Sequence, residues 1–163
     1  MTGREGRHYD FGTPRLISED ELRGFLLDCF DISEHECFVG HVDRAYEALK
    51  DVPDVAVFEA YCKYSEVSGH FAMYVELGVS MRLAARVGRM EFARKFAAHY
   101  DVYVLCSDDG EPLELWTIVL ADGTRLLASL EEWDDPILIY SATVPIPGLP
   151  EIRVNPNLEK PWG

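Results

Sequence analysis

A group of sulfur and imidazole side chains lies within a short stretch of the chain and has the ligand types that bind zinc. It consists of Cys29, His35, Cys37 and His41. Two thiolates and two imidazoles are enough in principle to close a tetrahedral site. The spacing does not match known zinc fingers, because no C-x-x-C pair is present, and the histidines do not form H-E-x-x-H. Cys29 also falls on the apolar stripe of a predicted helix, where a free cysteine packs as a small hydrophobic residue. A small metal-dependent protein or enzyme therefore stays as an alternative, and we expect no metal and no cofactor.

The remaining cysteines suggest a second kind of chemistry, nucleophilic attack by a thiolate. Cys62 or Cys106 would need His70 or His99 nearby in space to act as the base. Both cysteines lie inside apolar runs, which favours buried thiols of low reactivity. The sequence also has no glycine-rich phosphate loop, no dinucleotide-binding fingerprint and no G-x-S-x-G motif. We therefore expect a protein that is not an enzyme.

Pairs of acidic residues occur at two predicted turns of the C-terminal half. Paired carboxylates hydrolyse glycosidic bonds only when a cleft holds them opposite each other, whereas neighbouring residues in a turn point apart. A tryptophan among exposed acids is instead typical of a surface that recognises another protein. We predict that these turns contact a partner. The candidate partner-binding residues are Asp108, Asp109 and Glu111 in the first turn and Glu131, Glu132, Trp133, Asp134 and Asp135 in the second.

The balance of charge limits the kinds of partner. The chain of 163 residues has a formal net charge of −14, with 29 acidic and 15 basic side chains. Because nucleic acids and anionic membranes attract basic surfaces, neither is an expected ligand. A cationic protein partner fits this charge, and simple solubility is the alternative explanation. The charge is uneven, since residues 18–66 and 101–163 each have a net charge of −9, and residues 67–100 have a net charge of +3.

Three stretches in the first hundred residues are predicted to be helices. They cover residues near 18–29, 43–50 and 80–99. Ser18 and Ser80 have the side chain and the position of N-terminal caps. Gly88 interrupts the last stretch, which is either one kinked helix or two. Basic residues of that stretch, such as Arg82 and Arg86, are predicted to contact acidic parts of the same chain, with a contact across a dimer as the alternative.

The C-terminal half has the strongest β pattern. Apolar runs at 102–106, 113–120, 124–130 and 137–144 are separated by short turns, which predicts an antiparallel meander across 102–144. One of two alternating sets would face the helices, either Leu115, Thr117 and Val119 or Trp116, Ile118 and Leu120. Earlier in the chain, Val55–Val67 and Phe71–Leu77 are predicted to form a hairpin, with a helix across either run as the alternative.

The whole chain, residues 1–163, is predicted to be one α+β domain, with helices packed on one face of an antiparallel β-sheet and a C-terminal β-meander. Residues 1–17 are predicted to be a flexible arm and residues 18–144 the core. Residues 145–163 are predicted to be an extended, proline-rich arm that lies on the body or reaches a partner. The sequence has no apolar run of membrane-spanning length and no apolar stretch of a signal peptide at its start. Together with irregularly spaced cysteines, this predicts a cytoplasmic protein with reduced thiols.

Residues 80–140 resemble a group of bacterial proteins. The similarity rests on L-A-A-R-V-G at 83–88, V-Y-V-L at 102–105 and W-T-I-V-L-A-D-G at 116–123. Helices followed by a β-meander with such a hairpin are similar to small α+β proteins of actinobacteria and other bacteria that act as immunity proteins for secreted polymorphic toxins. The resemblance implies a protein that binds rather than catalyses, and it transfers no individual functional residue.

These patterns lead us to expect a non-enzymatic protein-binding module, an immunity protein that neutralises a basic bacterial toxin by occluding it. Complementary charge would speed its association with such a toxin. Two alternatives remain open. One is the metal-dependent protein or enzyme based on the cysteines and histidines at 29–41, and the other is a homo-oligomeric regulatory or structural protein in which the C-terminal arm pairs subunits. A monomer and a homodimer both agree with the sequence.

Overall fold

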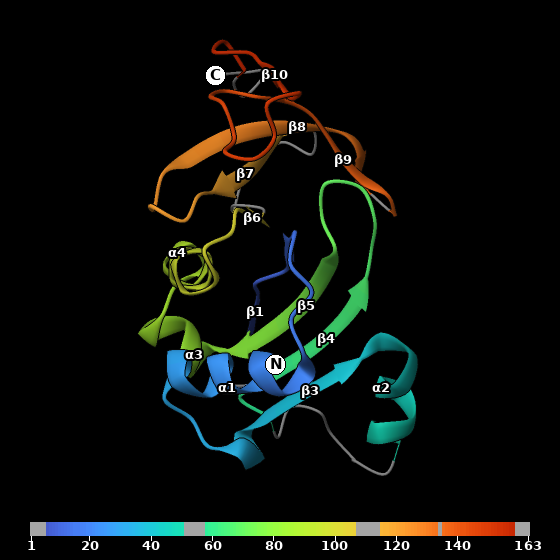
Figure 1. Cartoon of the computed structure of the whole chain (residues 1–163). Helices are drawn as coiled ribbons and strands as arrows, with labels where there is room; N and C mark the ends of the chain where they lie inside the picture. Colours follow the sequence, from blue (N-terminus) through green and yellow to red (C-terminus); the bar gives the residue numbers. More distant parts are fainter. Residues whose placement is uncertain (1–5, 51–57, 107–114, 134, 159–163) are drawn as a thin grey trace.

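The computed structural model describes residues 6–50, 58–106, 115–133 and 135–158. Within these ranges the protein is a mixed α/β structure with four α-helices and a ten-stranded, mostly antiparallel, open sheet (Figure 1). The first strands lie at one end of the molecule and the C-terminal strands at the other, and the helices lie beside the first half (Figure 1).

The strands form one continuous sheet that joins both halves of the chain. They are β1 Gly6–His8, β2 Phe11–Thr13, β3 Cys37–His41, β4 Ala60–Glu66, β5 Met73–Ser80, β6 Val104–Cys106, β7 Leu115–Val119, β8 Arg125–Trp133, β9 Ile137–Ala142 and β10 Arg153–Val154. Their order is β10-β9-β8-β7-β6-β2-β5-β4-β3. Strand β1 also pairs with β5, at the end of that strand, whereas β2 pairs with its start. The pairs β3–β4 and β9–β10 are parallel, and the other pairs are antiparallel.

Two of the described helices begin at the serine caps that the sequence predicts. The helices are α1 Glu19–Phe30, α2 Val42–Leu49, α3 Met81–Arg86 and α4 Arg89–Tyr100, with a short 3₁₀ helix at Glu34–Glu36. The Ser18 side chain accepts the Glu21 N–H, and the Ser80 side chain accepts the Leu83 N–H, which confirms both caps. The predicted stretch 80–99 is two helices, because Val87 is extended and Gly88 is the N-cap of α4.

The prediction of a flexible arm at residues 1–17 is wrong for residues 6–17. These residues supply β1 and β2, and β2 is the strand that joins β5 to β6. Tyr9, Phe11 and Ile17 are buried at 4% exposure or less. Three-residue strands among glycines and a proline have little local signal, and their partners lie more than sixty residues away in the sequence. Pairing with distant strands therefore decides the structure of this segment.

The predicted hairpin between residues 55 and 77 is confirmed for its described part. Strands β4 and β5 pair antiparallel from Ala60 opposite Val79 to Glu66 opposite Met73, so the helical alternative is excluded there. Residues 51–57, which include the predicted start of the first strand, lie outside the described residues. Alternate residues of β4 are buried, as expected for a strand with one face on a core.

Strands β6 to β9 each pair antiparallel with the next strand along the chain. Both alternating sets of β7 are largely buried. Val119 belongs to a first hydrophobic core with the helices, whereas Ile118 and Leu120 belong to a second core on the opposite face. Residues 115–120 are almost all apolar because the sheet has a hydrophobic core on each side at this point.

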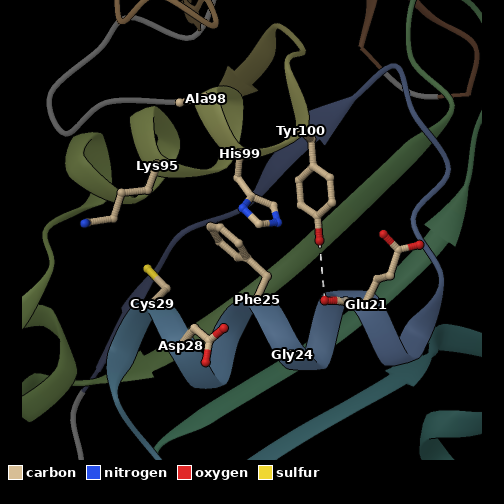
Figure 2. A pocket seen from close by; sticks show the side chains of 9 residues that line it. All are labelled: Glu21, Gly24, Phe25, Asp28, Cys29, Lys95, Ala98, His99 and Tyr100. Carbon is tan, nitrogen blue, oxygen red and sulfur yellow. Dashed lines mark hydrogen bonds between the residues drawn. The ribbon is translucent and has the colours of Figure 1, made fainter.

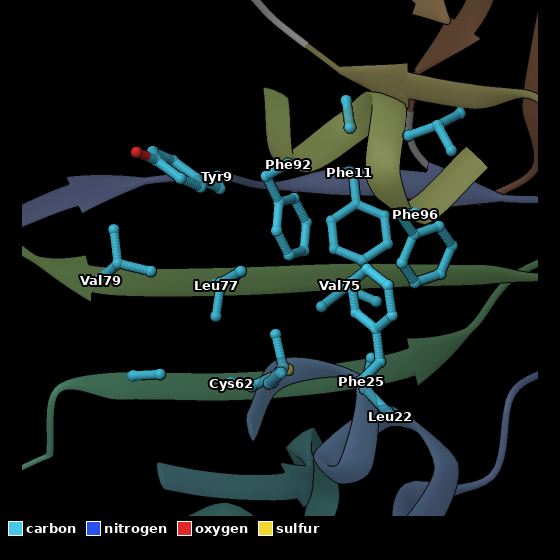
Figure 3. Close-up of a cluster of buried hydrophobic side chains, with 14 of the residues drawn as sticks. Tyr9, Phe11, Leu22, Phe25, Cys62, Val75, Leu77, Val79, Phe92 and Phe96 are labelled. Carbon is cyan, nitrogen blue, oxygen red and sulfur yellow. The ribbon is translucent and has the colours of Figure 1, made fainter. Parts of the chain in front are cut away.

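The first core lies between α1, α4 and strands of the sheet. Phe25 of α1 and Phe92 and Phe96 of α4 meet Phe11 of β2 (Figure 3). The ring centroids are 4.7 Å apart for Phe11 and Phe96 and 5.2 Å apart for Phe25 and Phe96, within the range of favourable aromatic pairs. These rings fix α1 and α4 side by side on the sheet.

The second core is completed by the proline-rich C-terminal segment. Ile146 and Ile152 are buried at 2% and 8% exposure, and they pack with residues of β7, β8 and β9. Arg153 and Val154 then add β10 to the edge of β9. Residues 145–158 therefore lie on the body, which is one of the two placements predicted for this arm.

The turn between β4 and β5 is joined to the start of β9. The Ile137 N–H donates to the Ser68 carbonyl, and the His70 N–H donates to the Ile137 carbonyl, both at 2.9 Å. His70 Nδ1 accepts the Ile139 N–H, also at 2.9 Å. Ser68 donates its N–H and its hydroxyl to Asp135 Oδ1 at 2.9 and 2.8 Å. This joint ties the two ends of the curved sheet together.

Replacing Gly69 with alanine tests how closely this joint is packed. Gly69 has a φ of +99°, and an added Cβ would overlap the Ile137 carbonyl oxygen. Gly123→Ala is the matched control, since Gly123 has a φ of +91° and no atom within 4 Å of an added Cβ. We expect Gly123→Ala to lower the free energy of unfolding by about 1–2 kcal/mol through backbone strain alone. Gly69→Ala should cost about 2 kcal/mol more, because two backbone hydrogen bonds must separate. Urea unfolding measures both, and equal losses would contradict a tight joint.

Candidate functional site

The predicted partner-binding residues lie partly outside the described structure. Asp108, Asp109, Glu111 and Asp134 lie outside the described residues, as do the side chains of Glu132 and Trp133. The structure does place Glu131 and Asp135, both exposed, at the end of β8 and the start of the following turn. The two predicted loops are therefore not brought together by any described contact.

Asp135 has a structural role that the sequence did not indicate. Its carboxylate accepts the two hydrogen bonds from Ser68 and so fixes the turn that follows β8 against the β4–β5 turn. Charge-assisted hydrogen bonds of this kind are stronger than neutral ones. Asp135 is consequently held in position on the body of the protein.

The cysteines and histidines proposed as an alternative metal site have other partners. His41 caps α2, since its Nδ1 accepts the Asp43 N–H at 3.1 Å, and its Nε2 lies 2.7 Å from Glu66 Oε1. His35 Nδ1 lies 3.0 Å from the Ser33 hydroxyl. Cys37 is buried in β3, and Cys29 is half-buried on α1. Within the described ranges no group of three or more histidine, cysteine, aspartate or glutamate side chains is placed to hold a metal ion.

Burial makes the thiols poor nucleophiles. It raises the pKa of Cys29 and that of Cys37 to about 11, and it also raises the pKa of the fully buried Cys62 well above its usual value. Since the thiolate is the reactive form, these groups are protonated near neutral pH. His70 and His99 are the candidate bases for a cysteine nucleophile, and both have other contacts. His70 accepts a hydrogen bond from β9, and His99 packs against the rings of Phe25 and Tyr100.

A groove of about 630 Å³ between α1 and α4 is a candidate site that the sequence analysis did not identify. Figure 2 shows its lining side chains, with α1 along one side and α4 along the other. Residues Glu21, Gly24, Phe25, Asp28 and Cys29 come from α1, and Lys95, Ala98, His99 and Tyr100 come from α4.

The groove has an aromatic floor and carboxylates along one wall. Phe25 and His99 face each other with ring centroids 5.3 Å apart, and the Tyr100 hydroxyl donates to the Glu21 carbonyl at 3.4 Å (Figure 2). Glu21 and Asp28 are exposed on α1. A site of this composition suits a positively charged group that has a flat, partly apolar surface.

Gly24 is the sequence signal that could have revealed the groove. A glycine inside a helix costs about 1 kcal/mol relative to alanine, so its presence in the middle of α1 calls for a reason. Packing against the described residues does not require a glycine here, because a Cβ added at Gly24 would meet no atom within 4 Å. The missing side chain leaves the floor of the groove open.

The basic residues of α3 and α4 mainly support the fold, as predicted. Arg82 pairs with Glu36 at 3.0 Å and with Glu59 at 3.1 Å, which joins α3 to the segments before β3 and β4. Arg86 donates to the Phe30 carbonyl at 2.7 Å and so caps the C-terminus of α1. The predicted contact with acidic residues of the same chain is therefore confirmed for Arg82, whereas Arg86 contacts backbone carbonyls.

Comparisons with protein-family models, with curated proteins and with solved structures find no match to this chain. Of the described helices, none has the length and apolar character needed to cross a membrane. The candidate site therefore has to be interpreted from its own geometry.

The reactivity of Cys29 separates a binding groove from a catalytic one. With a pKa of about 11, about a thousandth of Cys29 is thiolate at pH 8. Allowing for the greater nucleophilicity of a more basic thiolate, we expect alkylation about tenfold slower than that of a cysteine in a short peptide. The rate is measured by mass spectrometry with iodoacetamide on the native protein, and Cys29→Ala identifies the peptide. Alkylation faster than in the peptide would favour the enzymatic alternative.

Proposed function

We propose that this chain is a non-enzymatic protein-binding module, an immunity protein that neutralises a basic bacterial toxin by occluding it. The observation that carries the proposal is the anchored carboxylate of Asp135, next to β8, on a chain with a net charge of −14. Because Asp135 is already held by Ser68, it loses little conformational entropy on binding. Fixed negative charges favour fast and selective association with a cationic surface.

The proposal includes the finer arrangement expected from the sequence, in which the helices occupy one face of the sheet and the C-terminal strands form a meander. Support comes from the two cores, since α1 and α4 pack in the first core and the C-terminal segment packs in the second. In this arrangement the turn 131–135 and the loop 108–111, which lies outside the described residues, contact the partner. Their charge supplies the attraction, and the body of the protein supplies the occlusion.

We also propose that the protein acts in the cytoplasm, as a monomer or a homodimer. Cys29, Cys37 and Cys62 have free thiols, which suits a reducing compartment. The toxin would then be bound where it would otherwise act, or before its secretion.

Purification of the tagged protein from its own host at low ionic strength tests the proposed function. We expect a basic protein to co-purify in a fixed ratio, and its toxic activity to fall linearly to zero as the purified chain is added back at one equivalent. Recovery without a stoichiometric partner would contradict the proposal, as would a partner that stays active within the complex.

Reversal of charge in the two loops tests which residues attract that partner. The test variant carries Asp108→Lys, Asp109→Lys and Asp134→Lys, and the matched control carries Glu34→Lys, Glu47→Lys and Glu76→Lys, all exposed acids away from both proposed contact surfaces. Asp135 is left unchanged because it anchors the turn. At low salt the association rate of the test variant should fall by at least about tenfold relative to the control, whose net charge is the same.

Stopped-flow mixing with the captured partner measures these rates at two ionic strengths. The difference between the variants should shrink at high salt, because salt screens exposed charges. Equal association rates for the two variants at low salt would show that these loops are not part of the binding surface.

A further inference from the structure

The groove between α1 and α4 has an open floor that the fold does not need. Gly24 is exposed in the middle of α1, and an added Cβ there would contact no atom within 4 Å. A larger residue would fit the free protein and would favour the helix. The glycine leaves the helix backbone open to the approach of another molecule at this point.

The side chains around Gly24 define the chemistry of that molecule. Glu21 and Asp28 lie three residues before and four residues after Gly24, so their carboxylates flank it on the same side of the helix. The Asp28 side chain has no hydrogen bond or ion pair among the described residues, and it projects from α1 beside the groove (Figure 2). The wall is therefore acidic and available to a cation.

The floor of the groove offers one exposed ring to the same cation, that of His99, which lies against the buried rings of Phe25 and Tyr100. Phe25 and His99 lie 5.3 Å apart between their centroids, with Tyr100 next to His99. The structure already contains a guanidinium on one of these rings, since Arg15 Cζ lies 5.3 Å from the centroid of Tyr100. Arginine is the natural side chain that combines a flat, weakly hydrated cation with an apolar stem.

Lys95 is the basic residue of the groove, and it is paired with Glu91. Its Nζ lies 4.0 Å from Glu91 Oε2, on its own helix. Figure 2 shows the Lys95 side chain at the Cys29 end, pointing away from Glu21 and Tyr100. Arg15 already lies against Tyr100 at the Glu21 end, so the middle of the groove, beside Asp28, is the part that is open to a further cation.

We propose that the groove between α1 and α4 binds an arginine side chain of a cationic protein partner. The guanidinium lies over the exposed His99 ring, beside the buried Phe25 ring, and pairs with Asp28 and Glu21, and the arginine stem passes over Gly24. The inference rests on the proposed function for the class of partner, since it assumes that the partner is a basic protein. It adds a second contact surface, separate from the turn after β8.

An arginine peptide and its neutral analogue test this site without the partner. The probes are acetyl-Ala-Arg-Ala-amide and the same peptide with citrulline, which keeps the shape of arginine and removes its charge. We expect the arginine peptide to shift the amide NMR signals of Gly24, Phe25 and His99, with a dissociation constant of about a millimolar. The citrulline peptide should bind at least about tenfold more weakly, because it forms no ion pair.

Two variants and a control assign the binding to the groove. Gly24→Val fills the floor and should abolish the localised shifts, while the protein stays folded in urea titrations because the site has free space. Asp28→Asn should weaken binding about threefold or more by removing one charge. Glu34→Gln, an exposed acid away from the groove, should leave the affinity unchanged.

The results separate this inference from the proposed function. Absence of shifts at up to about 20 mM arginine peptide would overturn the arginine site. Equal binding of the citrulline peptide, or unchanged binding by Gly24→Val, would overturn it as well. If the arginine peptide does not bind while the chain still neutralises a basic partner, only the inference about the groove is wrong. If the peptide binds and no basic partner exists, the groove stands and the proposed function falls.

Discussion

Strand β6 is buried on both faces, and the rest of the structure depends on this short strand. Its three residues, Val104, Leu105 and Cys106, are each at most 2% exposed. Val104 and Cys106 point into the core that holds α1 and α4, whereas Leu105 points into the core that holds the C-terminal segment. Because β6 pairs with β2 on one side and β7 on the other, it links the two halves of the sheet. Neither core is complete without it.

This arrangement explains how a chain of modest size presents fixed surfaces at two places. Aromatic packing against the sheet fixes α1 and α4 at the spacing that leaves the groove between them. The second core and the joint through Ser68 and His70 hold Asp135 and the start of β9 in place. Both candidate contact surfaces are thus supported by buried residues of the same sheet, which limits their movement when a partner binds.

Local signals in the sequence predicted the elements that depend on local interactions. The serine caps of α1 and α3 and the antiparallel pairing of β4 with β5 follow from side-chain type and spacing. Strands β1 and β2 could not be predicted in this way, because each is three residues long and is stabilised by β5 and β6 far along the chain. The choice between the two faces of β7 was also undetermined, since both faces contact a core.

The candidate site, too, could be predicted only in part from local sequence, because other parts of it depend on contacts between distant segments. The acidic turn after β8 was recognisable from composition, but the hydrogen bonds that make Asp135 an anchor come from a turn nearly seventy residues away. The groove arises from the packing of α1 against α4, and no sequence pattern brings Asp28 and His99 together. Only Gly24 gave a local sign, because a glycine in a helix without a packing reason points to something outside the chain.

Hydrogen exchange of the protein alone and in complex with its captured basic partner is the most direct test of a fixed acidic recognition surface. We expect amide exchange to slow in the turn that joins β8 to β9, and to stay unchanged in α2 at the opposite end of the sheet order. Slowing confined to α2 and β3, with no change after β8, would contradict the central claim that this turn is where the protein meets its partner.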